Sequence, residues 1–184
     1  MITGPSGVGK GTLINALRER LPRLEVSVSA TTRKPRAGEL DGREYHFLSD
    51  EEFDRRLAAG DFLEHAGYTG KRYGTLRSEL ERDADALVLE IEIQGARQVR
   101  ETLPTATRVF IAPPSPEVLE ERLARRASDT PEEIRRRLEV AREELEARGE
   151  FEHVVVNDDL DAAVTELENL LAKVRGQQSP GGVQ

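Results

Sequence analysis

Gly4-Pro5-Ser6-Gly7-Val8-Gly9-Lys10-Gly11-Thr12 is the stretch of this sequence that decides the fold. Gly4, Gly9 and Lys10 have the spacing of a phosphate-binding P-loop, in which glycines let backbone N–H groups turn toward an anion. Apolar residues at helical spacing follow directly, so the loop is expected to open a helix whose N-terminal dipole also attracts negative charge. The stretch predicts a nucleotide-phosphate site, with Lys10 reaching the outer phosphates.

Two features depart from the usual P-loop pattern. Gly11 follows Lys10 where a hydroxyl normally contacts Mg²⁺, and Thr12 offers a hydroxyl one position later. The first strand is short, because only Met1 and Ile2 precede Thr3. The alternative to a phosphate-binding loop is a glycine-rich turn that only precedes a helix. A dinucleotide-binding fold is disfavoured because G-x-G-x-x-G is missing.

Composition narrows the class of protein. The chain has 184 residues, 37% of them hydrophobic, which fits one globular domain. It has no cysteine, which excludes disulfides, zinc–thiolate sites and a cysteine nucleophile. No apolar run is long enough to span a bilayer and no signal peptide is recognisable, so a cytoplasmic location is expected, without membrane association. A net charge of −8 disfavours nucleic-acid binding.

Strands and helices alternate along most of the chain, which predicts an α/β fold with a parallel sheet. Residues 31–75 differ, and suggest an inserted, partly antiparallel subdomain. The Gly-, Ser- and Pro-containing residues 176–184 are expected to form a disordered tail. The expected strands are 26–29, 86–93, 108–112 and 154–156, and the expected helices are 13–21, 49–60, 115–126, 130–148 and 160–174.

Further motifs follow the P-loop in a fixed order. They are 29–39 (SATTRKPRAGE), 42–47 (GREYHF), Glu64, 73–75 (YGT), 111–115 (IAPPS) and 156–160 (VNDDL). Together they resemble guanylate kinase, from residue 1 to about residue 174. The resemblance implies a P-loop NTPase three-layer fold with a parallel central sheet, an inserted GMP-binding α+β subdomain and a helical lid.

The resemblance also implies boundaries for these parts. One guanylate kinase-like domain would cover residues 1–175. Its core would take about 1–30, 76–124 and 150–175, the GMP-binding subdomain about 31–75 and the lid about 125–149.

Arg33 and Arg36 lie three residues apart on a loop, and their forked guanidinium groups suit a phosphate monoester. The resemblance implies that both hold the GMP phosphate, together with Tyr45 and Tyr73. Solvated arginines on a polar loop are the alternative.

Guanine presents two donors, N1–H and the 2-amino group, beside the O6 acceptor. A carboxylate accepts from both donors and a hydroxyl can donate to O6, whereas adenine would leave the carboxylate unmatched. The resemblance assigns these roles to Glu64, Ser29 and Thr75. An exposed Glu64 without a role is the alternative.

Glu90 and Glu92 lie two apart in the expected strand 86–93, which would place both on one face. The resemblance implies that Glu90 contacts Mg²⁺, through water, and that Glu92 belongs to the GMP site. The alternative is an edge strand that exposes an acidic face.

Arginines of the expected lid complete the implied site. Arg126 and Arg137 would clamp the transferring phosphoryl group and are catalytic, together with Lys10. Residues 4–12, Arg122 and Asn157 would bind ATP, and Thr12 is a second candidate for Mg²⁺. The three histidines show no metal-ligand spacing and are expected to be structural or exposed.

These observations predict an enzyme that transfers the γ-phosphoryl group of MgATP to GMP, or dGMP, by in-line displacement. Its partners are these small substrates. Two alternatives stay open: a guanylate-kinase-like binding module without turnover, and a P-loop kinase for another phosphorylated acceptor.

Overall fold

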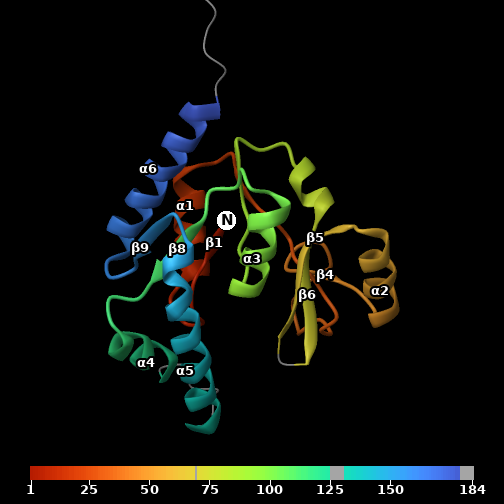
Figure 1. The fold of residues 1–184 in the computed structure, drawn as a ribbon, viewed down its shortest axis with the longest axis horizontal. Helices are drawn as coiled ribbons and strands as arrows, with labels where there is room; N and C mark the ends of the chain where they lie inside the picture. The colour runs from red at the N-terminus through yellow and green to blue at the C-terminus, as the bar shows by residue number, and fades with distance from the viewer. Residues whose placement is uncertain (69, 125–130, 179–184) are drawn as a thin grey trace, which may run out of the picture. The chain divides into compact units, whose positions relative to one another are not determined.

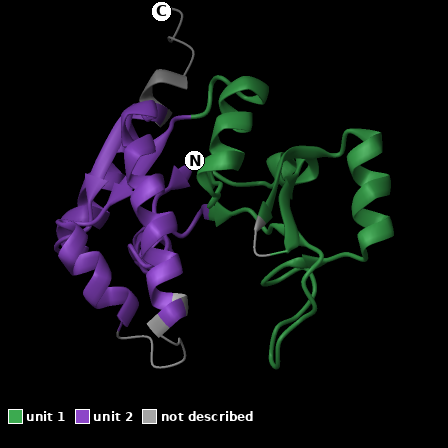
Figure 2. Cartoon of the chain, turned by 60° about the horizontal axis from the view of Figure 1, so that its bottom comes forward, with its two compact units in different colours: residues 1, 25–106 green, residues 2–24, 107–184 purple. Residues whose placement is uncertain are grey.

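The computed structural model describes residues 1–68, 70–124 and 131–178. The chain forms two compact units (Figure 2). Unit 1 contains Met1 and residues 25–106, and unit 2 contains residues 2–24 and 107–184. The expected GMP-binding segment, 31–75, lies wholly within unit 1. The finer division into core, GMP-binding subdomain and lid stays a prediction.

Unit 2 is built on a parallel sheet, as the alternating pattern predicts. Strands β1 (Ile2–Thr3), β8 (Val109–Ala112) and β9 (His153–Val156) lie in the order β1-β8-β9. Both pairings are parallel. Helix α1 (Lys10–Arg20) packs against α6 (Leu160–Gln178), and the two lie side by side in Figure 1. Fully buried side chains fill this unit, among them Leu13, Leu17, Phe110, Ile111, Val155 and Val164.

Two further helices of unit 2 carry predicted site residues, Arg122 on α4 and Arg137 on α5. Helix α4 (Pro116–Ala124) begins where Ser115 Oγ accepts a hydrogen bond from the Val118 N–H. Helix α5 (Pro131–Glu146) continues into the 3₁₀ helix η2 (Ala147–Glu150), close to the predicted end.

The end of the chain differs in part from the prediction. Helix α6 extends to Gln178, so the expected disordered tail, which begins at Gly176, starts within a helix. Residues 179–184 lie outside the described residues.

Unit 1 contains the mixed sheet predicted for residues 31–75. Its order is β4-β3-β6-β5, with β3 and β4 parallel and the other pairs antiparallel. Helix α2 (Asp50–Ala59) has the predicted ends, because Ser49 Oγ accepts from the Glu52 N–H and Gly60 adopts a left-handed conformation. The ring of buried Phe53 stacks on Phe62 at 4.4 Å. The strands are β3 (Ala30–Thr31), β4 (His46–Phe47), β5 (Phe62–Tyr68) and β6 (Lys71–Leu76).

Two strand predictions in unit 1 were wrong in extent. The strand expected at 26–29 is β2 (Leu24–Val26), and the strand expected at 86–93 is β7 (Ala86–Val88). β2 and β7 form a two-stranded sheet. The 3₁₀ helix η1 (Arg77–Glu81) links β6 to this region.

The apolar run after β7 begins a helix that was not predicted, α3 (Ile93–Thr102). Ile93, Ala96 and Val99 are buried at helical spacing. The apolar run that was predicted as one strand therefore contains the end of a strand and the start of a helix. Glu92 is the residue before α3, and Glu90 lies beyond the end of β7. The two carboxylates therefore do not share a strand face, which corrects that expectation.

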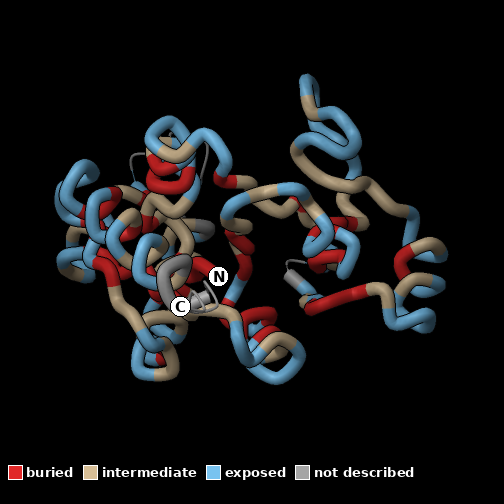
Figure 3. Tube along the Cα trace, turned by 90° about the horizontal axis from the view of Figure 1, so that it is seen from above, coloured by how far each residue is buried: buried red, intermediate tan, exposed pale blue. Residues whose placement is uncertain are grey.

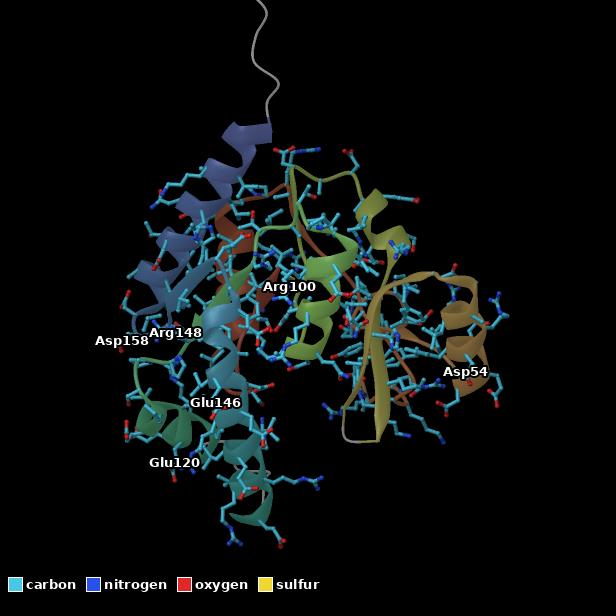
Figure 4. All side chains as sticks on the ribbon, viewed as in Figure 1. Asp54, Arg100, Glu120, Glu146, Arg148 and Asp158 are labelled. Atoms are coloured by element: carbon cyan, nitrogen blue, oxygen red, sulfur yellow. The ribbon has the colours of Figure 1, made fainter. Side chains whose placement is uncertain are left out.

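Each unit has a buried interior and a charged surface, and unit 1 also buries the carboxylates of Glu64 and Glu79. Buried stretches, red in Figure 3, alternate with exposed segments along the chain. Charged side chains cover the surface, as the labelled Asp54 on α2 and Glu120 on α4 illustrate (Figure 4). Among residues 1–68, 70–124 and 131–178, no helix combines the length and apolar character needed to cross a bilayer.

Candidate functional site

The loop between β1 and α1 depends on glycine at two close approaches. At Gly4, where φ is +150°, a Cβ would lie 2.3 Å from the Ile111 carbonyl oxygen of β8. At Gly9, where φ is +97°, a Cβ would lie 2.6 Å from Asn157 Nδ2. Any other residue at either position would be strained and would displace its neighbours. The glycine spacing seen in the sequence therefore has a steric cause.

Two predicted ATP-site residues hold this loop in shape. The buried Val8 carbonyl accepts from Asn157 Nδ2 at 2.7 Å and from Arg122 Nη1 at 3.3 Å. Arg122 Nη2 also donates to the Asn157 carbonyl at 3.0 Å. The structure thus brings Arg122 and Asn157 together at the loop, and the contacts of both shape its backbone.

The loop is electrostatically suited to an anion. Helix α1 has no acidic residue in its first turn and no side-chain cap, so nothing from the first turn neutralises its N-terminal dipole. Lys10 Nζ donates to the Gly4 carbonyl at 2.6 Å and to the Pro5 carbonyl at 3.4 Å, which holds the ammonium group against the loop. Thr12 is exposed on the first turn of α1.

Helix α5 reaches the same loop with two side chains. Arg137 Nη2 donates to Ser6 Oγ at 2.9 Å, and Glu144 Oε2 accepts from the Ser6 backbone N–H at 3.1 Å. Because Arg137 and Glu144 are seven residues apart, they lie on one face of the helix. Glu144 was not predicted, since nothing in its local sequence separates it from the other acidic residues of α5. Arg126, the other predicted clamp, lies outside the described residues.

In unit 1, three of the four predicted phosphate-binding residues come together. The Arg33 guanidinium lies 5.2 Å from the centre of the Tyr45 ring, and the Tyr45 and Tyr73 rings are 6.0 Å apart, edge to face. The Arg33 side chain is only 16% exposed. It is therefore not a solvated loop arginine, whereas Arg36 is exposed.

A carboxylate that was not predicted organises this cluster. Glu39 accepts both branches of the Arg33 guanidinium at 2.9 Å and the Arg36 backbone N–H at 2.7 Å. These bonds, from Arg33 first, hold the pKa of Glu39 below its usual range. The forked geometry that suits a phosphate here engages a carboxylate of the same loop.

The Tyr45 hydroxyl keeps its proton at neutral pH. Burial first, and then the neighbouring Tyr73, raise the pKa of Tyr45, and Glu90 adds to the rise. Tyr45 can therefore donate a hydrogen bond to an anion. Glu90 is half-buried and close enough to affect this group.

A second cluster in unit 1 surrounds Glu64. Glu64 on β5 pairs in register with Thr75 on β6, so the two side chains lie on one face of the sheet. Glu64 is 5% exposed, and Thr75 Oγ1 donates to its Oε1 at 2.8 Å. Helix α3 approaches so closely that a Cβ at Gly95 would lie 2.2 Å from Glu64 Oε2. The alternative interpretation, an exposed Glu64, is therefore excluded.

The charge state of Glu64 follows from this enclosure. Burial raises the pKa of Glu64, and the hydrogen bonds from the Thr75 hydroxyl and N–H offset the rise only in part. The charge of Glu92 raises it further, so these two predicted site residues lie near each other. The result is a buried carboxylate with few donors of its own.

Within the described residues, no group of three or more His, Cys, Asp or Glu side chains is arranged to hold a metal ion. His46 contacts Glu79 at 3.0 Å, which is a structural role, and His65 is exposed.

Sequence comparison then identifies the family. The family model described as guanylate kinase matches residues 1–174. This chain belongs to the guanylate kinase family. The match covers both the P-loop of unit 2 and the Glu64 cluster of unit 1, so both sites belong to the family domain.

Individual relatives agree with this assignment. A guanylate kinase from Synechococcus sp. (strain CC9311) is 54% identical over 171 residues, which cover 91% of this chain and 90% of the relative. One from Gloeobacter violaceus is 54% identical over 185 residues, covering 99% of this chain and 90% of the relative. A crystal structure of guanylate kinase from Anaplasma phagocytophilum matches with a TM-score of 0.74 at 32% identity, covering 98% of this chain and 86% of that one. The predicted α/β P-loop fold of this guanylate kinase family member is thereby confirmed.

The raised pKa of Glu64 predicts how the stability of this guanylate kinase family member changes with pH. Protonation of Glu64 contributes stability that is fully present below the pKa of Glu64 in the unfolded chain, about 4.3. This contribution is lost as the pH rises through the higher pKa of Glu64 in the folded state. We expect Glu64→Gln to have the higher free energy of unfolding at pH 8 in urea titrations. The difference should shrink as the pH falls toward 5. A Gln variant that is less stable at both pH values would contradict the assignment of a strained buried charge.

Proposed function

We propose that this protein catalyses the reversible transfer of the γ-phosphoryl group of ATP to GMP, giving ADP and GDP, with dGMP as a second acceptor. Family membership supports this reaction class. The observation that carries the choice of acceptor is the buried Glu64–Thr75 pair, which belongs to the same unit as the Arg33–Tyr45–Tyr73 cluster. A cytoplasmic location is proposed on the same grounds, because ATP and GMP are metabolites of that compartment.

Glu64 and Thr75 would read the guanine ring. The carboxylate accepts from N1–H and the 2-amino group, while O6 accepts from the Ser29 hydroxyl, or from the Thr75 hydroxyl once it turns away from Glu64. Glu92, beside Glu64, would extend the acceptor edge. A buried carboxylate with few donors has spare acceptor capacity, which a guanine ring fills and an adenine ring does not.

The phosphate of GMP would bind at Arg33, Arg36, Tyr45 and Tyr73. Arg33 already lies against the Tyr45 ring and interacts with the side chain of Tyr73, and Tyr45 retains its donor proton. The exposed Arg36 can turn toward an incoming anion. Glu39 already accepts from both terminal nitrogens of Arg33, so a bound phosphate would either share the guanidinium with Glu39 or displace Glu39 from it.

Residues 4–12 would bind the phosphates of ATP, with the backbone N–H groups and Lys10 as donors. Arg122 and Asn157 support the loop through Val8. Arg137, already at Ser6, would neutralise charge on the transferring group, with Arg126 as its proposed partner. The acceptor is an anionic phosphate oxygen, so no strong general base is needed, and catalysis consists of positioning and charge neutralisation.

Mg²⁺ fits this donor set. The ion is usually held by one or two protein oxygens, phosphates and water, which agrees with the lack of a three-residue cluster among the described residues. Thr12 and Glu90 are the residues proposed to hold it, directly or through water. When bound, Mg²⁺ neutralises charge on the phosphates.

A coupled assay of ADP formation tests the function, with ATP and each of GMP, dGMP, AMP and UMP as acceptors. We expect turnover with GMP and dGMP and little with the others. Preference for AMP or UMP would overturn the proposal. ATP binding without turnover of any acceptor would indicate a binding module instead.

Gly95→Ala is expected to weaken GMP binding without unfolding the protein. The added methyl group would collide with Glu64 Oε2, which is the end of a flexible side chain, so the carboxylate should move instead of the helix. Loss of one hydrogen bond to a charged group corresponds to about a 10- to 100-fold rise in KM for GMP. Gly67→Ala on β5, where a Cβ would meet nothing within 4 Å, is the control. Unchanged KM in both variants would count against Glu64 as a GMP ligand.

Arg137→Ala should lower kcat about 10²- to 10³-fold with a small change in KM for GMP, because a transition-state contact is lost. Arg135→Ala, exposed on the same helix, is the matched control and should stay close to wild type. Steady-state kinetics with both substrates varied gives the two constants. If only the KM for GMP rises in Arg137→Ala, Arg137 is not a catalytic residue.

A further inference from the structure

Glu79 is a buried carboxylate that lies outside the predicted site residues. It is on η1 and is 5% exposed. Its Oε2 accepts from the Val28 N–H and from Arg82 Nε, both at 2.7 Å, and its Oε1 lies 3.0 Å from His46 Nε2. One side chain thus receives donors from two other segments of unit 1, at Val28 and His46, and from Arg82 at the end of its own segment.

Each of these segments carries a proposed GMP-binding residue. Val28 precedes Ser29, His46 follows Tyr45, and η1 follows directly on β6, which contains Tyr73 and Thr75. The His46 N–H also donates to the Ser29 carbonyl at 2.9 Å. Val28, Ser29, His46 and Glu79 therefore form a closed ring of covalent and hydrogen bonds.

The ring requires an ionised carboxylate. Burial raises the pKa of Glu79, but the hydrogen bonds from Arg82, Val28 and His46 outweigh it and the pKa lies below its usual range. An ionised carboxylate only accepts, so His46 donates through a protonated Nε2. Arg82 is itself held by Glu25, at 3.5 Å, on the opposite side.

We propose that Glu79 is a positioning residue for the acceptor nucleotide, which it serves by fixing the segments of Ser29 and Tyr45 relative to β6. This inference rests on the proposed GMP-binding role of unit 1. Glu79 is not itself a ligand of the nucleotide. Its contribution is to hold Ser29 and Tyr45 in the geometry that bound GMP requires, so that binding does not have to order them.

Glu79→Gln is the most direct test. The amide keeps the shape of the side chain, but its NH2 group replaces an acceptor oxygen and so opposes one of the donors that Glu79 accepts from. We expect the KM for GMP to rise about 10-fold, with the KM for ATP and kcat within about 3-fold of wild type. Glu81→Gln, an exposed neighbour on η1, is the control and should match wild type. Equal KM values for GMP in wild type and Glu79→Gln would overturn the inference, even if the variant melts at a lower temperature.

His46 provides a second test that leaves Glu79 bonded to Val28 and Arg82. His46→Phe removes one donor and should raise the KM for GMP about 3- to 10-fold. His46→Gln restores a side-chain donor and should recover part of the loss. No change in His46→Phe, or no recovery in His46→Gln, contradicts the ring. Failure of the wild type to phosphorylate GMP would refute the proposed function, whereas the comparison of each variant with the wild type tests only the role of Glu79.

Discussion

Burial of the Glu64 carboxylate is the physical constraint that shapes the proposed acceptor site in unit 1. A carboxylate is buried between β5, β6 and α3 with Thr75 as its donor, and its pKa is raised as a result. Folding alone would favour a neutral side chain at this position. The arrangement is understandable when a ligand supplies the missing donors, and the guanine edge of GMP has the matching pair.

Glu79 shows what a buried carboxylate looks like when the fold itself satisfies it. It has three donors, two of them from other segments of the chain, and a pKa below the usual range, whereas Glu64 has a pKa above it. The two residues lie in the same unit and are equally buried, because each is only 5% exposed. The contrast distinguishes a carboxylate whose acceptor capacity the fold itself fills from one that we propose accepts from the guanine of GMP.

Much of this organisation could be predicted from the sequence, and the rest could not for definable reasons. The P-loop and the ends of α2 were predictable because glycine spacing and capping residues act locally. The end of β7 and the start of α3 were not, because a buried apolar run fits both a strand and a helix. Glu79 and Glu144 were missed because they accept hydrogen bonds from residues distant in sequence, Val28 and His46 for Glu79 and Ser6 for Glu144. Glu39 was missed although its partners Arg33 and Arg36 are close in sequence. In a chain rich in acidic residues, burial is what distinguishes them.

Direct binding of GMP, IMP and AMP to the wild-type protein, measured by calorimetry, tests the central claim about Glu64. IMP lacks the 2-amino group but retains N1–H, and AMP lacks both donors. We expect GMP to bind most tightly, IMP about 10-fold more weakly and AMP too weakly to measure, because each missing donor leaves the buried carboxylate less satisfied. Equal affinities for GMP and AMP would show that Glu64 does not read the base.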